Sequence, residues 1–574
     1  MKKCVVHQND PESCAWWSFA GAMKKGKVFA YVPADKEPKW AWEWEKEWEK
    51  PAPAFSTNKY YLYSLEEYVE GTNMSREWYD IMIYEIDGRF GYVETKTGCM
   101  LTEPCYVYAD PFYDHAENGC VRDELGQFWY VDRKGKRSKD AETTMRRLIF
   151  ESLMEMDFDA RQPSLHKRIK WELNGILEAN HADTFNEAWE LVRDSKRAGY
   201  PVIASGAAGS SIIAYFMGIT DVNPLPPHYV CPSCHHHEWA AEGSVADGYD
   251  LPPEDCPSCG QVMRGDGHDL CPEFFLGLDG QRPPKFSLRF SPEYLPEISI
   301  KKDAPKADRL HHDVPTLLHS LEELTGIASA DVPMNDKTVY GLLTSPNALG
   351  ATAEEIGWEA GTLGIPELDN SFIQHASHAI GAGSFADLVK VHSLAHSVTG
   401  WFQNAEDLIQ KGICSPSELI GARDDVMLYL MRKGIRRKRA FETAQQVAHG
   451  RVPSRGFDAR TTDLFRRHGI PDWWMESCQA IGYSHPKAHS VSHMSMAVRL
   501  LWHKLYHPKE FYTVVFSACD NNALFEAAAK GKEAVSSRYF ELQEKMVDRT
   551  DEELTEMNGL RLVNECLCRG VILI

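Results

Sequence analysis

Four cysteines in the middle of the chain constrain its fold more than any other feature of the sequence. They form two Cys-x-x-Cys pairs, Cys231 with Cys234 and Cys256 with Cys259, and 21 residues separate the pairs. Each pair can place two thiolates in one tight turn, and four thiolates make the tetrahedral shell that structural Zn²⁺ prefers. The spacing therefore predicts a zinc ribbon at residues 228–272 whose metal is structural. Unpaired buried thiols are the alternative.

The total number of cysteines and the net charge indicate the cellular compartment and limit the kinds of partner. The chain has 15 cysteines and no apolar run long enough for a membrane span or a secretory signal, which predicts a reducing, cytoplasmic environment and no membrane. Its net charge of −21 argues against binding nucleic acid through bulk charge. A local basic channel stays open, because charges act mainly within a Debye length of about 8 Å.

Local patterns divide the chain into four segments. Residues 1–145 are rich in Trp and Tyr, with strand-like runs at 59–63 and 128–131 and a Trp-rich run at 40–48. Those tryptophans could stack on bases, but interleaved Glu favours their packing in a small core. We expect a mixed region at 146–316, a helical region at 317–520 and a helical segment at 521–574. Residues 299–315 are expected to form a linker or long loop, and Thr184 is expected to cap a helix.

A glycine-rich turn lies just before the first cysteine pair. Residues 199–216 indicate a short strand, a Gly/Ser turn and an apolar helix. Free N–H groups at such a helix start can bind phosphate, whereas the other interpretation is an ordinary turn with a Ser cap. The candidate residues are Gly206, Gly209, Ser210 and Ser211.

Basic side chains are concentrated farther along the chain. Six cations lie within eight residues, and they could neutralise phosphates or form only a solvated helix face: Arg432, Lys433, Arg436, Arg437, Lys438 and Arg439. A long amphipathic helix is expected to begin at Pro486-Lys487-Ala-His489. Lys487 and Arg499 on this helix could face a polyanion or only solubilise the helix.

Several motifs occur in the same order as in a known protein family. They are residues 206–211, 218–231, 266–269, 404–409, 412–414, 420–427, 471–473 and 486–489. Together they resemble the polymerase core of the PolC-type DNA polymerase III alpha subunit, a C-family replicative polymerase. The resemblance covers about residues 165–568, with a gap.

The resemblance implies a fold and a reaction. The fold is α+β multidomain, with a nucleotidyltransferase-like palm, an inserted zinc ribbon and mostly α-helical fingers. The reaction is template-directed DNA synthesis on a primer–template, with two Mg²⁺ ions held by three palm aspartates. Together, the resemblance and the basic patterns above give these candidate nucleotide- and DNA-binding residues: Gly206, Gly209, Ser210, Ser211, Arg423, Arg436, Arg437, Lys487, His489 and Arg499.

The chain departs from this family where the chemistry occurs. The family has two aspartates in an Asp-x-Asp strand, and this chain has Lys285 and Ser287 there. The third aspartate is kept as Asp308, the catalytic residue that the resemblance predicts. Ser205 replaces an Arg that contacts the triphosphate, and the stretch between the two palm motifs is reduced to about 296–306. One carboxylate holds two Mg²⁺ ions poorly, and Lys285 repels cations.

We therefore expect a PolC-like protein of DNA replication that binds primer–template DNA but has lost its own nucleotidyl transfer. The alternative is an inactive replisome decoy or regulator that binds a polymerase partner or another replisome protein, from a phage or mobile element. Other possibilities are a minimal active polymerase that uses Glu293 or Asp303, an inert remnant, and half of a split enzyme.

Overall fold

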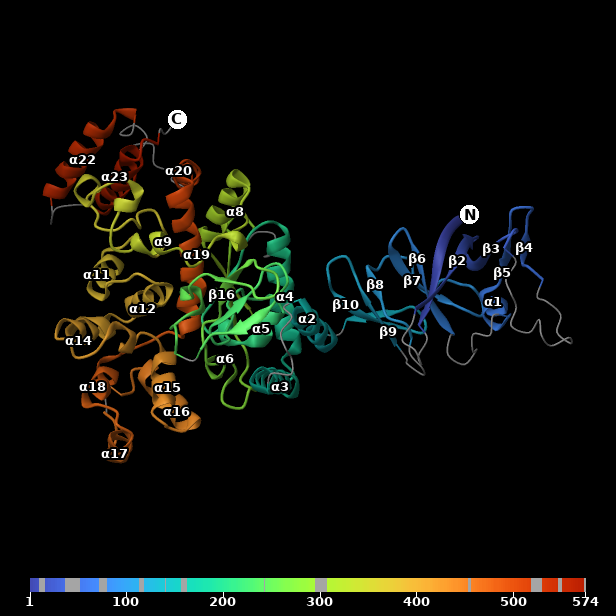
Figure 1. Ribbon diagram of the computed structural model, residues 1–574, viewed down its shortest axis with the longest axis horizontal. Coiled ribbons are helices and arrows are strands. Elements are labelled where there is room, and N and C mark those ends of the chain that lie inside the picture. Colours follow the sequence, from blue (N-terminus) through green and yellow to red (C-terminus); the bar gives the residue numbers. More distant parts are fainter. Residues whose placement is uncertain are drawn as a thin grey trace. The chain divides into compact units, whose positions relative to one another are not determined.

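A computed structural model describes residues 1–9, 16–36, 52–71, 80–112, 118–139, 141–155, 163–241, 243–294, 307–452, 456–517, 529–545 and 550–571. The predictions for residues 40–48, for Asp303 and for 296–306 therefore fall outside the described residues. The chain forms two compact units, Met1–Arg147 (unit 1) and Leu148–Ile574 (unit 2). Figure 1 gives the order of their elements along the chain.

Unit 1 contains two antiparallel sheets. The first has the strand order β4-β5-β3-β2-β1-β6-β7 and the second β11-β10-β9-β8. Val28, Ala30 and Val32 alternate with more exposed residues along β3, so one face of the first sheet is buried. The runs expected at 59–63 and 128–131 are confirmed as β5 and β10. The bounds are β1 (Lys2–Asn9), β2 (Trp16–Lys24), β3 (Lys27–Pro33), β4 (Phe55–Ser56), β5 (Tyr60–Tyr63), α1 (Leu65–Gly71), β6 (Ile81–Ile86), β7 (Arg89–Glu94), β8 (Tyr108–Ala109), β9 (Asn118–Arg122), β10 (Phe128–Asp132), β11 (Arg137–Lys139) and α2 (Ala141–Glu155).

Unit 2 contains a small sheet, here called the central sheet, of β12 (Ile203–Ser205), β17 (Phe286–Phe290) and β18 (Ala307–His311). β17 pairs antiparallel with β12 and parallel with β18. Phe286, Leu288 and Phe290 are buried on one face of β17, which leaves Ser287 and Arg289 on the other. The surrounding helices are α3 (Pro163–Glu178), α4 (Ala182–Arg197), α5 (Ile212–Phe216) and α6 (Glu273–Leu276).

Two local expectations for this part of the chain were wrong. Helix α4 begins at Ala182 after His181, without a side-chain cap, so Thr184 lies inside the helix and is buried. The second half of the segment expected to be a linker is strand β18, followed by α8 from Asp313. Pairing with β17 overrides the polar, Pro-containing composition that indicated a loop.

The cysteine pairs lie in a second small sheet, here called the cysteine-rich sheet. Its strand order is β14-β13-β16-β15, with β13 (His228–Val230), β14 (His237–Trp239), β15 (Glu254–Asp255) and β16 (Val262–Asp266). Tyr229, Leu251 and Met263 pack with Cys231 and Cys256 in its own small core. The four thiols are thereby carried on turns that packing already fixes.

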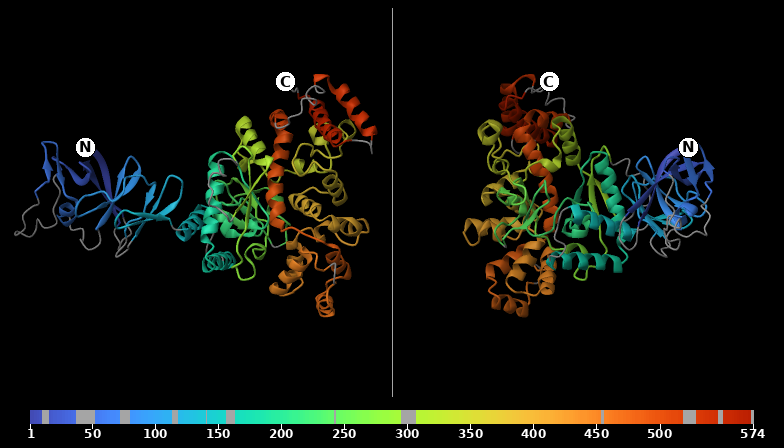
Figure 2. Two further views of the ribbon diagram at one scale, coloured as in Figure 1. Left: turned by 180° about the vertical axis from the view of Figure 1, so that it is seen from behind. Right: turned by 45° about the vertical axis from the view of Figure 1, so that its right-hand side comes forward.

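The rest of unit 2 is helical and is organised around one long helix, α19 (Lys487–Tyr506). This helix begins where the sequence predicts, but it is buried on nearly every side because the central sheet, α8, α12 and α20 all pack against it. Figure 2 shows it between the central sheet and the outer helices. The other bounds are α8 (Asp313–Thr325), α9 (Lys337–Gly341), α10 (Ala353–Ile356), α11 (Ser371–Ile380), α12 (Phe385–Ala395), α13 (Val398–Gly400), α14 (Glu406–Gln410), α15 (Arg423–Arg432), α16 (Arg437–Ala448), α17 (Ala459–Arg467), α18 (Asp472–Ala480), α20 (Pro508–Ser517), α22 (Lys532–Glu544) and α23 (Asp551–Cys568).

The chain is thus a mixed helix-and-sheet, α+β multidomain protein, as the sequence predicts. Unit 2 holds the three later predicted segments in one compact body, so the boundaries between them stay predictions. Among the described helices, none combines the length and the apolar character that crossing a bilayer requires.

Candidate functional site

Three of the residues singled out by sequence lie in one row across the central sheet. Ser287 of β17 pairs with Ser205 of β12 on one side and with Asp308 of β18 on the other. Residues paired directly across strands point to the same face. The row therefore places Asp308, the one retained aspartate, beside the hydroxyl group of Ser287.

Asp308 pairs with a cation from the residue just before β17. Its Oδ2 lies 2.9 Å from Nζ of Lys285 and 3.4 Å from Oγ of Ser287. Both partners of the ion pair are largely exposed, with side-chain exposures of 73% and 47%. An ion pair this exposed adds little stability. It does, however, hold an ammonium group against the carboxylate that a divalent ion would use.

The other end of the row leads into a hydrogen-bonded chain of polar groups. Arg289 donates from Nε to Oγ of Ser205 at 2.8 Å, and the same Oγ lies 2.8 Å from Nε2 of His493 on α19. The second nitrogen of His493, Nδ1, lies 2.6 Å from Oε1 of Glu367. This chain of hydrogen bonds joins the polar face of the central sheet to α19 and to the loop before α11.

Glu367 is the centre of a histidine cluster that the sequence interpretation missed. His312, His392 and His493 each place a ring nitrogen within 3.1 Å of its carboxylate. Burial alone would raise the pKa of Glu367, but hydrogen bonds from these three rings bring it well below its usual range. The sequence did carry a signal: His392 with His396, and His489 with His493, are pairs four residues apart, which share one face of a helix.

The cluster continues beside α19 and α12 as a series of neighbouring histidine rings. His489 lies 4.5 Å from His493 and 4.7 Å from His485, measured between ring centroids, and His396 lies 4.6 Å from His392. Burial and neighbouring histidines lower the pKa of His396 to about 4. Burial and Arg423 lower the pKa of His485 to about 4. Both rings are therefore neutral at pH 7.

The glycine-rich turn has the expected strand–turn–helix form, but a carboxylate already lies at its helix start. Ser211 is the N-cap of α5, accepting from the N–H of Ala214, and it donates to Oε2 of Glu172 at 2.7 Å. Gly209 and Ser210 are buried, and Gly206 has φ +75° and donates its N–H to Nδ1 of His489 at 3.2 Å. Glu172 thus satisfies the positive end of α5. Phosphate binding by these residues stays a prediction.

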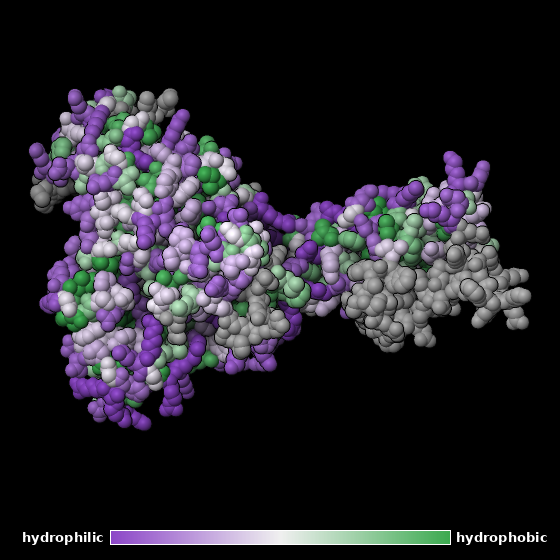
Figure 3. Space-filling view, in the orientation of Figure 1, coloured by the Kyte–Doolittle hydropathy of each residue, from purple (hydrophilic) through white to green (hydrophobic). Residues whose placement is uncertain are grey.

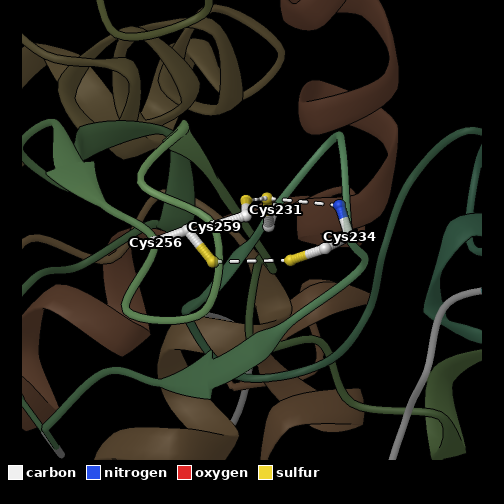
Figure 4. A group of neighbouring side chains, drawn as sticks. All are labelled: Cys231, Cys234, Cys256 and Cys259. Carbon is white, nitrogen blue, oxygen red and sulfur yellow. Dashed lines mark hydrogen bonds between the residues drawn. The ribbon is translucent and has the colours of Figure 1, made fainter.

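The four predicted metal cysteines come together (Figure 4). Sγ of Cys231 lies 3.4 Å from Sγ of Cys259, Sγ of Cys234 lies 3.5 Å from Sγ of Cys256, and all four sulfurs lie within 4.8 Å of one another. A zinc tetrahedron with bonds of about 2.3 Å has sulfur–sulfur edges of about 3.8 Å, so this donor set fits Zn²⁺ closely. The thiols are free, and bonds from the backbone N–H groups of Cys234 and Ser233 lower the pKa of Cys231 to about 6.

Comparison with known proteins gives the same assignment for two successive stretches of the chain. The family model for the bacterial DNA polymerase III alpha NTPase domain matches residues 143–301, and that for the alpha subunit finger domain matches 314–454. The chain belongs to the PolC-type family of DNA polymerase III alpha subunits.

Three similar relatives are each named "DNA polymerase III PolC-type". That of Caldanaerobacter subterraneus subsp. tengcongensis is 31% identical over 533 residues, which cover 75% of this chain and 38% of the relative. That of Oceanobacillus iheyensis is 30% identical over 532 residues, covering 75% and 37%. That of Clostridium perfringens is 32% identical over 480 residues, covering 66% and 33%. The chain spans between a third and two fifths of the length of these relatives.

The residues that the PolC resemblance implies on α15 and α19 are mostly engaged inside unit 2. Lys487 donates from Nζ to the carbonyl of His268 at 2.7 Å, next to the cysteine-rich sheet. His489 is buried, and burial with neighbouring histidines lowers its pKa far below the usual range. Arg423 donates to the carbonyl of Ser484 at 2.8 Å. Arg499 is only 9% exposed and donates to the carbonyl of Ser329, so a contact with DNA would require its side chain to leave this position.

The basic stretch between α15 and α16 is different, because most of its side chains reach solvent. Arg436 and Lys438 are exposed, and Arg437 is exposed but pairs with the buried carboxylate of Glu273. In the space-filling view, hydrophilic side chains predominate over α16 and α17, at the lower edge of unit 2 (Figure 3). Of the sequence-predicted cations, those of this stretch are the ones placed to meet a polyanion without rearrangement.

Proposed function

We propose that this PolC-family protein acts in DNA replication by binding primer–template DNA, and that it does not catalyse nucleotidyl transfer at its own central sheet. The proposal takes the central sheet as the palm, with its partner strands and turn in the positions that the family resemblance implies. The PolC relatives support the replication role, and the chemistry of the central sheet supports the absence of the reaction.

The single observation that carries the proposal is the ion pair between Lys285 and Asp308. Two Mg²⁺ ions need bridging carboxylates, and each Mg²⁺ demands oxygen ligands in near-octahedral order at about 2.1 Å. Here the row offers the carboxylate of Asp308 and the hydroxyl groups of Ser205 and Ser287, and the ammonium of Lys285 lies 2.9 Å from that carboxylate. A hydroxyl group is a weak ligand and an ammonium excludes cations, so this face is poorly suited to the two-metal reaction.

Primer extension tests the absence of catalysis. Purified protein is incubated with labelled primer–template, dNTPs and either Mg²⁺ or Mn²⁺, beside the variant Asp308→Ala. We expect no extension above the Asp308→Ala level. Extension by the wild-type chain that Asp308→Ala abolishes would show an active polymerase, whereas extension equal in both would identify a contaminating enzyme.

We further propose that the basic stretch at the start of α16 contacts the DNA backbone. Arg436 and Lys438 are exposed and sit beside the hydrophilic surface of α16 and α17. Each phosphate contact contributes about 0.9 to the slope of log K against log salt. Arg436→Ala/Lys438→Ala should therefore flatten the slope by up to about 2, measured by fluorescence anisotropy. Lys134→Ala/Lys136→Ala, two exposed cations of unit 1, is the charge-matched control. Equal slopes in the two double variants would remove this contact.

The four cysteines are proposed to hold one structural Zn²⁺ ion. All four coordination positions are filled by thiolates, so the ion would fix the turns of the cysteine-rich sheet and take no part in a reaction. Binding would contribute on the order of 10 kcal/mol to local folding. Elemental analysis checks this: Cys231→Ser/Cys234→Ser should contain one zinc fewer per chain than the wild type, and unchanged zinc content would contradict the site.

A further inference from the structure

Glu367, whose carboxylate contacts three histidines, has an unusual backbone conformation. Its backbone has φ +70°, in the left-handed region that residues other than glycine seldom adopt. Residues in such conformations persist where the surrounding structure holds them, and they cluster at sites that bind ligands. The conformation directs the carboxylate toward two histidines that belong to different elements, His312 before α8 and His493 on α19.

The three groups converge on one point. The closest nitrogens of His312 and His493 lie 3.1 and 2.6 Å from the same oxygen, Oε1 of Glu367, and the three ligand atoms all lie within 4.8 Å of one another. Two imidazoles and one carboxylate form a donor set that suits Zn²⁺ and the neighbouring divalent transition metals. Hard ions such as Mg²⁺ prefer all-oxygen shells.

The surroundings of His493 suit a metal ligand. A ligating imidazole needs its free nitrogen at the metal and its other N–H directed to an oxygen. With the metal at Nδ1, the N–H at Nε2 of His493 would donate to Oγ of Ser205, 2.8 Å away. That hydroxyl also accepts from Arg289, so the ring would be oriented from the central sheet.

His312 and His392 also contact Glu367, and the second nitrogen of each ring has a different partner. Nδ1 of His312 faces the N–H of Val314 at 3.2 Å, so binding through Nε2 would exchange a helix-capping bond for a metal bond. His392 places Nε2 2.8 Å from the other carboxylate oxygen, and its Nδ1 lies 3.0 Å from Oγ of Ser490. A third imidazole is thereby held against Glu367 without being one of the three converging groups.

We propose that His312, Glu367 and His493 form a second metal site, for a transition-metal ion of the zinc class, separate from the four-cysteine site. The site has three protein ligands, which leaves a coordination position open, unlike a closed structural centre. The ion would add positive charge behind Ser205, on the polar face of the central sheet. The competing explanation is a metal-free network in which a histidinium ion neutralises Glu367.

Cobalt binding to the 574-residue chain distinguishes the two sites. Co²⁺ held by four thiolates gives intense sulfur charge-transfer absorption, whereas Co²⁺ held by imidazole and carboxylate gives only weak d–d bands. We expect the wild type to bind two Co²⁺ ions, one of each kind, and to contain two Zn²⁺ ions by mass spectrometry after growth in zinc. A wild-type chain that binds only the thiolate-held ion would overturn the proposal.

Variants identify the ligands. His493→Ala and Glu367→Gln should each lower the affinity for the Co²⁺ ion that lacks sulfur bands, on the order of a hundredfold or more. Loss of a metal ligand costs more affinity than loss of a residue that only hydrogen-bonds to a ligand. Retained thiolate absorption, together with helix content unchanged by circular dichroism, shows that the fold of these variants is intact. His375→Ala is the matched control, because His375 also pairs with a glutamate, Glu406, and neither residue is one of the three converging groups. Full affinity in the two ligand variants would support the metal-free network instead.

A second measurement covers misfolding of those variants. Cys231→Ser/Cys234→Ser removes the thiolate site and leaves His312, Glu367 and His493 intact, so it should still bind one Co²⁺ ion without sulfur bands. Loss of both ions in this variant, with helix content unchanged by circular dichroism, would assign all metal binding to the cysteines.

Discussion

Replacing Lys285 by methionine should tighten divalent-ion binding at Asp308, and the size of the effect follows from one distance. The ammonium nitrogen lies 2.9 Å from Oδ2 of Asp308. An Mg²⁺ ion bound to that oxygen sits about 2.1 Å from it, so ion and ammonium come within about 5 Å of each other. Methionine keeps most of the side-chain volume and removes the charge.

The repulsion can be worked from Coulomb's law. Two charges against one at about 5 Å in a medium of water-like permittivity repel by about 1.7 kcal/mol, and this permittivity suits an ion pair as exposed as this one. A Debye length of about 8 Å reduces the repulsion to about 1 kcal/mol. Lys285→Met should therefore bind the ion roughly fivefold to twentyfold more tightly.

Mn²⁺ titration followed by electron paramagnetic resonance measures this affinity. Binding that Asp308→Asn also shows is subtracted, which removes ions held at other sites. Lys285→Arg keeps the charge and should bind as the wild type does, whereas Lys285→Asp/Ser287→Asp supplies two further carboxylates and should bind more tightly than Lys285→Met. Equal affinities in Lys285→Met, Lys285→Arg and the wild type would refute the electrostatic reasoning.

Three further predictions concern the packing around α19. Nζ of Lys504 lies 2.7 Å from the carboxylate of Glu565, and both side chains are fully buried. Lys504→Met should therefore lower the free energy of unfolding by about 3–5 kcal/mol in urea titrations, and Lys504→Met/Glu565→Gln should recover part of this loss. A loss below about 1 kcal/mol in Lys504→Met would contradict the buried pair. Burial lowers the pKa of His503 to about 4, so below its ordinary value of about 6.5 the unfolded chain binds a proton that the folded chain does not. This histidine alone should therefore lower the free energy of unfolding by about 2–3 kcal/mol between pH 7 and pH 4.5. His503→Leu should lose that part of the pH dependence, measured by denaturant midpoints at both pH values. A Cβ at Gly209 would lie 3.3 Å from Cβ of Ala488, so Gly209→Ala should lower the melting temperature, and an unchanged value would show that the turn yields freely.

Local patterns predicted those parts of the structure whose determinants are close in the sequence. The Cys-x-x-Cys turns, the strand–turn–helix at 199–216 and the start of α19 each depend on residues a few positions apart. Four cysteines from two such turns converge because each turn already holds two of them. The mixed α+β class follows from the same local signals.

The histidine cluster could not be predicted because its members meet only through tertiary packing. Glu367 is 55 residues from His312 and 126 residues from His493. Each residue has an ordinary alternative interpretation on its own, as a helix cap, a loop acid or a core histidine. Strand β18 was missed for a related reason, since its pairing with β17 is parallel and its composition is that of a loop. Burial of Arg499 was missed because α19 is covered on more sides than its apolar stripe indicates.

The two ends of α19 are tied down by different parts of the protein. At the start, the N–H of Lys487 donates to the buried Asp424, and its side chain reaches the carbonyl of His268. Near the end, Lys504 is locked to Glu565 of α23. A helix anchored at both ends moves as one body and does not bend locally. Amide hydrogens along α19 should therefore exchange in a single concerted opening, and a ligand that tilts one end of the helix should displace the other end as well.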